Sequence, residues 1–146
     1  QGLRRLVVVN GHGGNCFKNM IRDLAVDYPD FLIAASEWFA VCRAADYFDD
    51  PGDHADELET SVMMHYRPEL VDLSVAGDGA WRPFAASSLR DRTAWIPRDW
   101  SRVSTDTGIG DPRGATAEKG ARFARAVVER YAVLLDELVR GTIYSE

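Results

Sequence analysis

The chain has 146 residues, 46% of them hydrophobic, and 17 Lys and Arg against 23 Asp and Glu give a net charge of −6. This apolar content is too high for an intrinsically disordered chain, and the length is that of one folded domain. The sequence has no basic excess, and no apolar run approaches the roughly 20 residues of a membrane-spanning helix, which argues against nucleic acid and membrane partners.

The two cysteines indicate a reducing environment. Cys16 and Cys42 stand alone in a chain that opens without a signal-peptide pattern, so we expect free thiols and a cytoplasmic protein. Cys16 follows a glycine-rich loop, where a thiol at a helix start can be activated. Without a clear base partner, a buried structural cysteine is the interpretation that the sequence favours.

The first third of the chain predicts a βαβ unit. Residues 3–9 are almost continuously apolar and β-branched, which is typical of a parallel strand buried on both faces. A glycine-rich loop at residues 10–15 leads to a predicted helix from Phe17 to Tyr28, with Asn15 as its N-cap. Residues 30–35 predict a second buried strand, and the whole unit is right-handed by default.

The middle of the chain is less regular. Residues 36–45 predict a short helix or loop, residues 46–53 an acidic turn, and residues 54–66 a helix. Residues 69–109 predict loops and short strands. This segment holds three tryptophans that either line a substrate pocket or fill a subunit interface, and its irregularity favours the interface: Trp81, Trp95 and Trp100.

The last helix is the most regular prediction. Thr116 is expected to cap a helix over residues 117–140. Its apolar stripe is spaced by three and four: Ala121, Ala124, Val128, Tyr131, Leu135 and Leu138.

The loop NGHGGN is the first candidate site, because ligands collect at the carboxyl ends of parallel strands. His12 could bind a divalent metal, could form hydrogen bonds within a structural turn, or could belong to a phosphate-binding loop. The dinucleotide pattern GxGxxG fails at Cys16, and the phosphate loop GxxxxGK[ST] is absent. HExxH and GxSxG are absent too.

The second candidate site is the acidic segment around His54. On a helix, His54 and Glu57 share one face, whereas Glu59 is rotated from His54 by about 140°. His54 and Glu59 can therefore serve one site only if His54 lies at the helix mouth, outside the regular turns. The alternative is an acidic first turn that complements the helix dipole, which explains the acids but not the histidine.

Three motifs together resemble the creatininase (creatinine amidohydrolase) family. They are VVNGHGGN at residues 8–15, HADELETS at residues 54–61 followed by PELVD at residues 68–72, and TGIGDPRGATAEKG at residues 107–120. The resemblance implies an α/β fold with a mostly parallel sheet flanked by helices in a Rossmann-like layering. Members are metal-dependent amidohydrolases that use zinc, manganese or iron, often as two ions, and they are commonly hexamers.

The resemblance carries roles over to single residues. His12 matches the family's metal-binding histidine, and Glu59 matches a candidate metal ligand. His54 matches the histidine proposed as acid and base, and Glu57 matches a position that is often acidic and that we assign to catalysis beside it. We also expect three neighbouring loop residues to contact substrate: Gly13, Gly14 and Asn15.

Two positions depart from the creatinine-hydrolysing members. Gly14 stands where they carry a glutamate ligand, and Asp50 stands where they carry a tryptophan, which argues against creatinine as the substrate. The Gly13-Gly14 form is similar to the wider family, which includes formamide-cleaving enzymes of pterin and flavin pathways and peptide-trimming enzymes of redox-cofactor maturation.

The family's other metal ligands, a Glu-x-His pair and an Asp, come from a segment upstream of the glycine-loop strand. We therefore expect residues 1–146 to be a single α/β domain that forms the C-terminal part of a longer family domain, with the first strands of the sheet upstream. The main hypothesis is an amidohydrolase that uses a metal-activated water, with a small-molecule amide as substrate and a homo-oligomeric assembly. The alternatives are a non-catalytic family member or fragment that serves as an oligomeric structural domain, and a glycine-loop nucleotide binder.

Overall fold

The computed structural model describes residues 2–141 and 143–144, and the chain divides into two compact units. The first unit combines the residues up to Arg43 with those from Arg125 onward, and the second holds Ala44–Ala124. Within the described ranges, no helix is long and apolar enough to cross a membrane.

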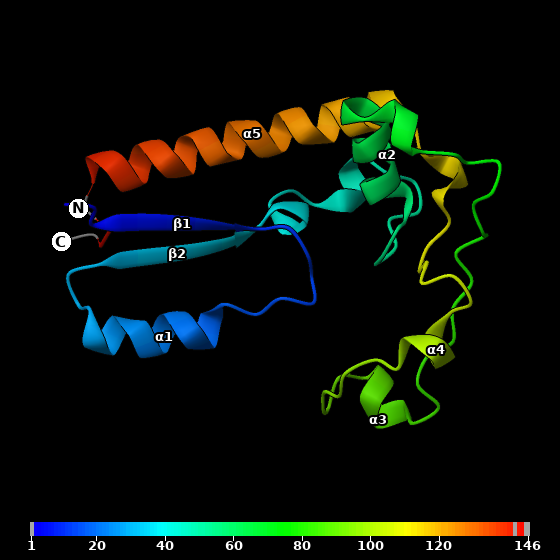
Figure 1. Cartoon of the computed structure of the whole chain (residues 1–146), viewed down its shortest axis with the longest axis horizontal. Coiled ribbons are helices and arrows are strands. Elements are labelled where there is room, and N and C mark those ends of the chain that lie inside the picture. The colour runs from blue at the N-terminus through cyan, green and yellow to red at the C-terminus, as the bar shows by residue number, and fades with distance from the viewer. Residues whose placement is uncertain (1, 142, 145–146) are drawn as a thin grey trace. The chain divides into compact units, whose positions relative to one another are not determined.

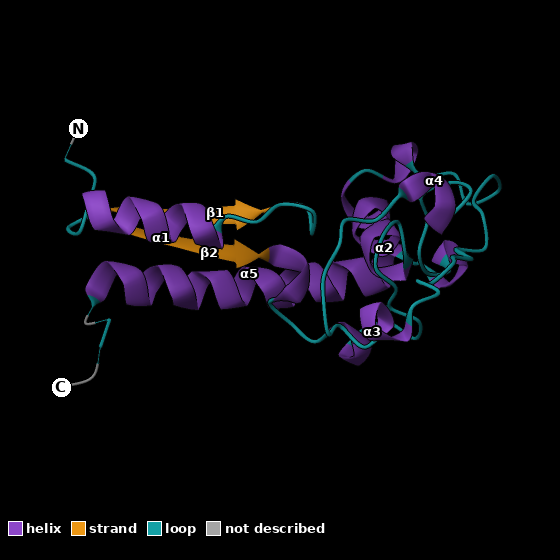
Figure 2. Ribbon diagram, turned by 90° about the horizontal axis from the view of Figure 1, so that it is seen from below, coloured by secondary structure: helices purple, strands orange, loops and turns teal. Residues whose placement is uncertain are grey.

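The first unit is built on two parallel strands. Strand β1 (Arg5–Asn10) pairs with β2 (Leu32–Glu37) in a register that places Val7 beside Ala34. Helix α1 (Lys18–Asp27) connects them and lies on one side of the pair, and the C-terminal part of helix α5 (Ala117–Arg140) lies on the other (Figures 1 and 2). The predicted α/β fold, a parallel sheet flanked by helices, is confirmed.

Two hydrogen-bonded contacts join α5 to this sheet. The Arg5 guanidinium donates to the backbone carbonyls of Leu138 and Val139, which satisfies carbonyl groups at the end of the helix and places a cation at its negative pole. The Tyr131 hydroxyl donates to Ser36 Oγ at 3.1 Å, and so ties the middle of this helical segment to β2.

Three local predictions in this part of the chain are wrong in whole or in part. Cys16, expected to be a buried structural cysteine, is exposed. The N-cap of α1 is Phe17, not Asn15, because the Asn15 side chain donates to Asn10 in the preceding loop. The stripe predicted along α5 is correct only in part. Ala124 is buried as predicted, but Val128 is 59% exposed, and Phe123 and Val127 are buried in addition.

The second unit contains helix α2 (Glu57–Tyr66) and several short helical turns. The predicted short strands of residues 69–109 are wrong, because this segment folds as loops with short helices, and its extended pairing is a single bridge between His54 and Ile109. The short helices of the chain are η1 (Trp38–Ala40), η2 (Ala44–Asp46), η3 (Pro68–Leu70), α3 (Ser87–Arg90), α4 (Trp100–Val103) and η4 (Pro112–Gly114).

An aromatic cluster and a close helix crossing hold this unit together. The Phe123 ring lies 5.3 Å from the Phe48 ring and 5.4 Å from the Tyr47 ring, measured between centroids. A Cβ on Gly120 would lie 2.0 Å from the Ser61 carbonyl oxygen, so α2 and the start of α5 can approach only at a glycine. Ser61 Oγ also accepts from the Thr116 amide at 3.1 Å.

We predict that the isolated 146-residue chain self-associates, because strand β1 leaves apolar side chains uncovered: Leu6 is 46% exposed and Val9 is 56% exposed. Val9→Lys should lower the average mass measured by sedimentation velocity. Val75→Lys, at a loop position that is 81% exposed, is the matched control and should leave it unchanged. A monodisperse monomer of the unmodified chain, unfolding cooperatively, would contradict this prediction.

Candidate active site

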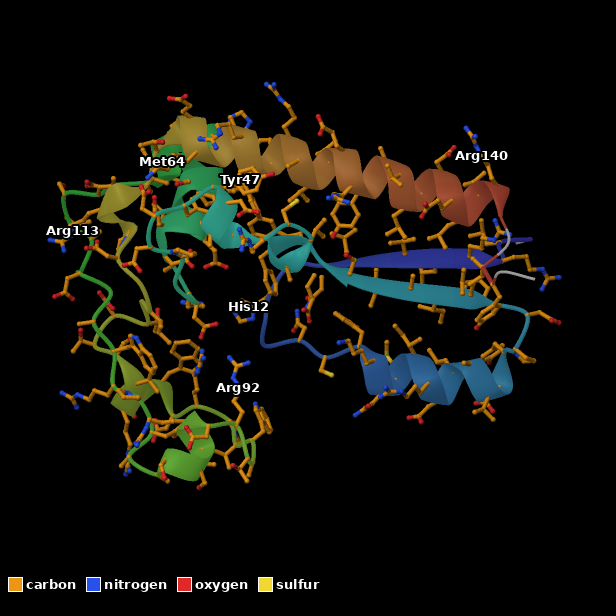
Figure 3. All side chains as sticks on the ribbon, turned by 180° about the vertical axis from the view of Figure 1, so that it is seen from behind. His12, Tyr47, Met64, Arg92, Arg113 and Arg140 are labelled. Carbon is orange, nitrogen blue, oxygen red and sulfur yellow. The ribbon has the colours of Figure 1, made fainter. Side chains whose placement is uncertain are left out.

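The loop after β1, on which Figure 3 labels His12, is held by its own polar groups. Asn10 Oδ1 accepts from the His12 amide at 3.2 Å and from Asn15 Nδ2 at 3.1 Å. The Gly14 amide donates to His12 Nδ1 at 3.0 Å. A Cβ on Gly14 would lie 2.9 Å from that ring nitrogen, so a side chain at this position would require the imidazole to shift.

This geometry fixes the state of the His12 ring. Since Nδ1 accepts a hydrogen bond from an amide, the proton of the neutral imidazole is on Nε2. A metal bound through Nδ1 would displace the Gly14 amide, and a metal bound through Nε2 would require Nδ1 to carry the proton. The loop as described therefore does not fit a metal ligand without a change in this hydrogen bond.

His54 lies at the mouth of α2, outside its regular turns, as the sharing of one site with Glu59 requires. Its backbone pairs with Ile109 in both directions, with N···O distances of 3.2 and 2.8 Å. Its Nδ1 lies 2.9 Å from the Thr107 carbonyl oxygen. Because a carbonyl can only accept, Nδ1 is the donor, and Nε2 has the lone pair of the neutral ring.

The backbone around His54 is tightly packed. A Cβ on Gly52 would lie 2.2 Å from the Ile109 carbonyl oxygen, and a Cβ on Gly79 would lie 1.9 Å from the Gly110 carbonyl oxygen.

Two non-glycine residues in this region adopt positive φ. They are Ala55 at 49° and Thr107 at 68°. Both flank the His54 contact, and strained backbone of this kind persists only where the surrounding structure enforces it.

Asp56 and Glu59 form a reciprocal cap at the start of α2. Asp56 Oδ1 accepts from the Glu59 amide at 2.9 Å, and Glu59 Oε2 accepts from the Ala55 amide at 2.7 Å. This arrangement is close to a capping box, and it fixes the backbone that follows His54. Burial raises the pKa of the Asp56 carboxyl above its ordinary value, against the lowering effect of the hydrogen bond from the Glu59 amide.

Glu57 is 1% exposed and both of its carboxylate oxygens are engaged. Oε2 accepts from the Asp50 amide at 2.7 Å, and Oε1 pairs with the Lys119 ammonium. Lys119 also binds Asp49 at 2.7 Å. These two hydrogen bonds raise the pKa of Lys119, and the Lys119 hydrogen bond lowers the pKa of Asp49. The contacts of Glu57 are those of a buried ion pair that joins α2 to α5.

The second unit contains a cavity of about 570 Å³, which His54 does not itself line but which two of its contacts do. Trp100 and Thr107 line it, and both contact His54: the Trp100 ring centroid lies 5.0 Å from that of the imidazole. Trp81 lines the same cavity, whereas Trp95 is 83% exposed.

The predicted site residues thus fall into two groups. His54, Glu57 and Glu59 occupy one segment of the second unit, and His12 with its neighbours belongs to the first. Among residues 2–141 and 143–144, no group of three His, Cys, Asp or Glu side chains is arranged to hold a metal ion.

Sequence reasoning missed three contributors to the His54 environment. The Thr107 carbonyl and the Trp100 ring come from a distant, irregular segment, and no local sequence pattern predicts their contacts with His54. The cap was recognisable in principle, because Asp56 and Glu59 have the D-x-x-E spacing of a capping box.

Comparison with known proteins identifies the class. The sequence model of the Creatininase family, described as creatinine amidohydrolase, matches residues 1–135. The chain therefore belongs to the creatininase family.

Individual relatives agree with this assignment. The chain is 53% identical to a candidate creatinine amidohydrolase from Bacteroides fragilis NCTC 9343, with a TM-score of 0.94 over 99% of this chain and 58% of that one. It is 36% identical over 130 residues to a mycofactocin precursor peptide peptidase of Mycobacterium ulcerans (strain Agy99), which covers 86% of this chain and 45% of the relative. A creatininase mutant of the Zn-Zn type shares the fold, with 23% identity and a TM-score of 0.70 over 96% of this chain and 58% of that one. The chain thus spans about half the length of the relatives that it matches.

We predict that Asp56→Ala destabilises the protein by about 1 kcal/mol, because it removes the helix cap, whereas Asp56→Asn retains an acceptor and loses much less stability.

The two variants also test the raised pKa of the Asp56 carboxyl. Because the folded pKa of Asp56 is raised, its protonated form is favoured in the folded state, so the wild type should gain stability relative to Asp56→Asn as the pH falls from 7 through that pKa. Chemical denaturation at several pH values measures both, and a difference that is constant with pH would contradict the assignment.

Proposed function

We propose that this chain is part of a hydrolase that cleaves the C–N bond of a small cyclic or linear amide, with His54 as the acid and base. The observation that carries the proposal is the His54 imidazole, which contacts the Thr107 carbonyl at 2.9 Å and the Trp100 ring, two groups of residues that line a cavity of about 570 Å³. Family membership supports the reaction class, since both an amidohydrolase and a peptide peptidase break a C–N amide bond.

The proposed role of His54 follows from its tautomer. With Nδ1 donating to Thr107, Nε2 can accept a proton from the attacking water. The water oxygen bonds to the amide carbon, the C–N bond breaks, and the imidazolium returns the proton to the leaving nitrogen. The products are a carboxylic acid and an amine, so atoms and charges balance. The Thr107 carbonyl accepts the hydrogen bond from Nδ1 and so holds the ring in one orientation during the reaction.

The proposed substrate pocket is the cavity that the His54 contacts Trp100 and Thr107 line. Trp81 and Trp100 offer flat apolar surfaces that suit a planar amide or a heterocycle. Arg82 and Arg102 line the same cavity and offer donors to a substrate oxygen. The predicted substrate contacts at Gly13, Gly14 and Asn15 belong to the other unit and stay a prediction.

The contacts of Glu57 support a positioning role. Its carboxylate is occupied by Lys119 and the Asp50 amide, so Glu57 holds the start of α2, and with it the backbone after His54. A direct catalytic role for Glu57 stays a prediction.

From the family resemblance we also propose that the protein binds one or two divalent metal ions. The proposed ligands are His12 and Glu59, and the metal is zinc, manganese or iron. These two side chains do not complete a site, and the His12 hydrogen bond to Gly14 opposes ligation, so further donors would be required. We also propose a cytoplasmic location, as expected from the two cysteines, and a homo-oligomer, which the family resemblance implies to be a hexamer.

His54→Ala should lower kcat by about 10²- to 10⁴-fold, because it removes the group that transfers the proton. The measurement is hydrolysis of a panel of simple amides and short peptides, with amine release as the readout. His65→Ala is the matched control, since His65 lies in the last turn of the same helix and should leave activity unchanged. Equal activity in His54→Ala and wild type would refute the proposal.

Glu57→Gln separates the two roles considered for that residue. A positioning role predicts lower thermal stability and a reduced kcat with an unaltered pH profile, whereas a catalytic role predicts loss of one limb of the profile.

Metal content tests the second part of the proposal. Metal binding as the family resemblance implies it predicts about one or two Zn, Mn or Fe per chain in protein purified without chelator, measured by elemental mass spectrometry, and loss of that metal in His12→Ala. His65→Ala again serves as the control. A metal-free wild type would show that His12 and Glu59 do not assemble a site in this chain and would favour the non-catalytic alternative.

A further inference from the structure

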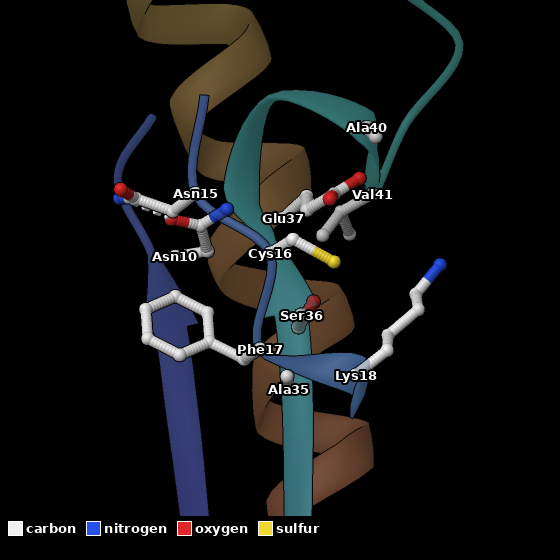
Figure 4. A pocket seen from close by; sticks show the side chains of 10 residues that line it. All are labelled: Asn10, Asn15, Cys16, Phe17, Lys18, Ala35, Ser36, Glu37, Ala40 and Val41. Atoms are coloured by element: carbon white, nitrogen blue, oxygen red, sulfur yellow. Dashed lines mark hydrogen bonds between the residues drawn. The ribbon is translucent and has the colours of Figure 1, made fainter. Parts of the chain in front are cut away.

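A second cavity, of about 290 Å³, lies at the carboxyl ends of the two strands in the first unit (Figure 4). It is bounded on one side by the end of β1 and the start of α1, and on the other by the end of β2 and the turn after it. Neither His12 nor any glycine of its loop lines this cavity. The side chains that matter here are Asn10, Cys16, Lys18, Ser36 and Glu37.

Asn10 presents an unpartnered donor to this cavity. The residue is 3% exposed, and the described part of the chain offers its Nδ2 no hydrogen-bond acceptor. The amide cannot be turned over, because Oδ1 already accepts from the His12 amide and from Asn15 Nδ2. Figure 4 shows Nδ2 directed away from Asn15, toward the space between Cys16 and Glu37. A buried donor of this kind costs free energy unless an acceptor meets it.

The start of α1 adds a second source of donors to the same cavity. Phe17, the N-cap, supplies no side-chain acceptor, and the first turn contains no acidic residue. The first amide groups of the helix therefore have no capping side chain, and the positive end of the helix dipole favours a negatively charged ligand. At ten residues, α1 is long enough for this effect.

A cation, a hydroxyl and a carboxylate also line the cavity. Lys18 contributes a cation from the first position of α1, and Ser36 contributes a hydroxyl from β2. Glu37 is the acidic residue among those that line it. The cavity thus combines one buried side-chain donor, Asn10 Nδ2, with a cation, a hydroxyl and one opposing carboxylate.

We propose that this cavity binds an oxyanion, a carboxylate or a phosphate group, with one oxygen accepting from Asn10 Nδ2 and the charge facing the start of α1 and Lys18. The site is separate from the His54 cavity and does not depend on the hydrolase proposal. Its function would be to anchor the charged end of a ligand.

The test is a titration of the unmodified chain followed by the side-chain amide signals of Asn10 in two-dimensional NMR. The probes are sodium acetate and sodium phosphate, with sodium chloride at equal ionic strength as the control. We expect a saturable shift of the Asn10 signals with acetate or phosphate and none with chloride, and the probe with the lower Kd identifies the ligand chemistry. The absence of a saturable shift with both probes, or an equal shift with chloride, would overturn the proposal.

Variants locate the binding. Lys18→Gln should weaken the affinity by about threefold, because an exposed ion pair contributes little. Arg22→Gln, which removes the same charge from α1 outside the cavity, is the matched control. Glu37→Gln should strengthen binding by removing the opposing charge. Asn10→Asp, which keeps an Oδ1 acceptor but replaces the donor, should weaken it by more than about tenfold. Affinities that are equal in Lys18→Gln, Glu37→Gln and Arg22→Gln would place the anion elsewhere and refute the site.

Discussion

The close approach of two backbone segments, residues 52–56 and residues 107–111, is the constraint on which the His54 site depends. The segments pair through His54 and Ile109, and glycine at positions 52 and 110 permits an approach that any side chain would prevent. The pairing keeps His54 out of α2 and brings the Thr107 carbonyl to its ring. The positive φ values of Ala55 and Thr107 are the local cost of this arrangement.

The acidic residues near His54 serve mainly to hold that geometry. Asp56 caps the helix, Glu59 binds the Ala55 amide, and Glu57 is paired inside the unit with Lys119. A cluster that reads in sequence as a set of catalytic or metal-binding carboxylates is therefore largely engaged in hydrogen bonds of the scaffold. The His54 imidazole differs from these carboxylates. The Thr107 carbonyl fixes its tautomer, and the Nε2 lone pair can then accept a proton.

Local patterns predicted the elements whose causes are local. The strand–loop–helix–strand order was correct, and the last helix matched residues 117–140, because its periodicity and the Thr116 cap are properties of adjacent residues. The helix predicted over residues 54–66 begins only at Glu57, because His54 pairs with Ile109 instead. His54 thus meets the condition that angular spacing sets for sharing a site with Glu59. Residues 69–109 could not be predicted, because contacts such as Gly79 with Gly110 link distant positions. The departure from the predicted stripe on α5 has the same origin: Phe123 is buried by an aromatic cluster that helical periodicity does not encode. The unpartnered Asn10 Nδ2 could not be predicted from the sequence either, since the burial and the partners of this side chain depend on both strands.

The most direct test of the central claim is the tautomer of His54, measured by long-range ¹H–¹⁵N correlation of the imidazole nitrogens at a pH where the ring is neutral. The structure predicts a protonated Nδ1 and an unprotonated Nε2, as the Thr107 carbonyl requires, and a change in this state when Thr107→Pro disturbs the backbone. A proton on Nε2 in the unmodified chain would contradict the account, because the nitrogen assigned to proton transfer would then have no lone pair to accept the proton of water.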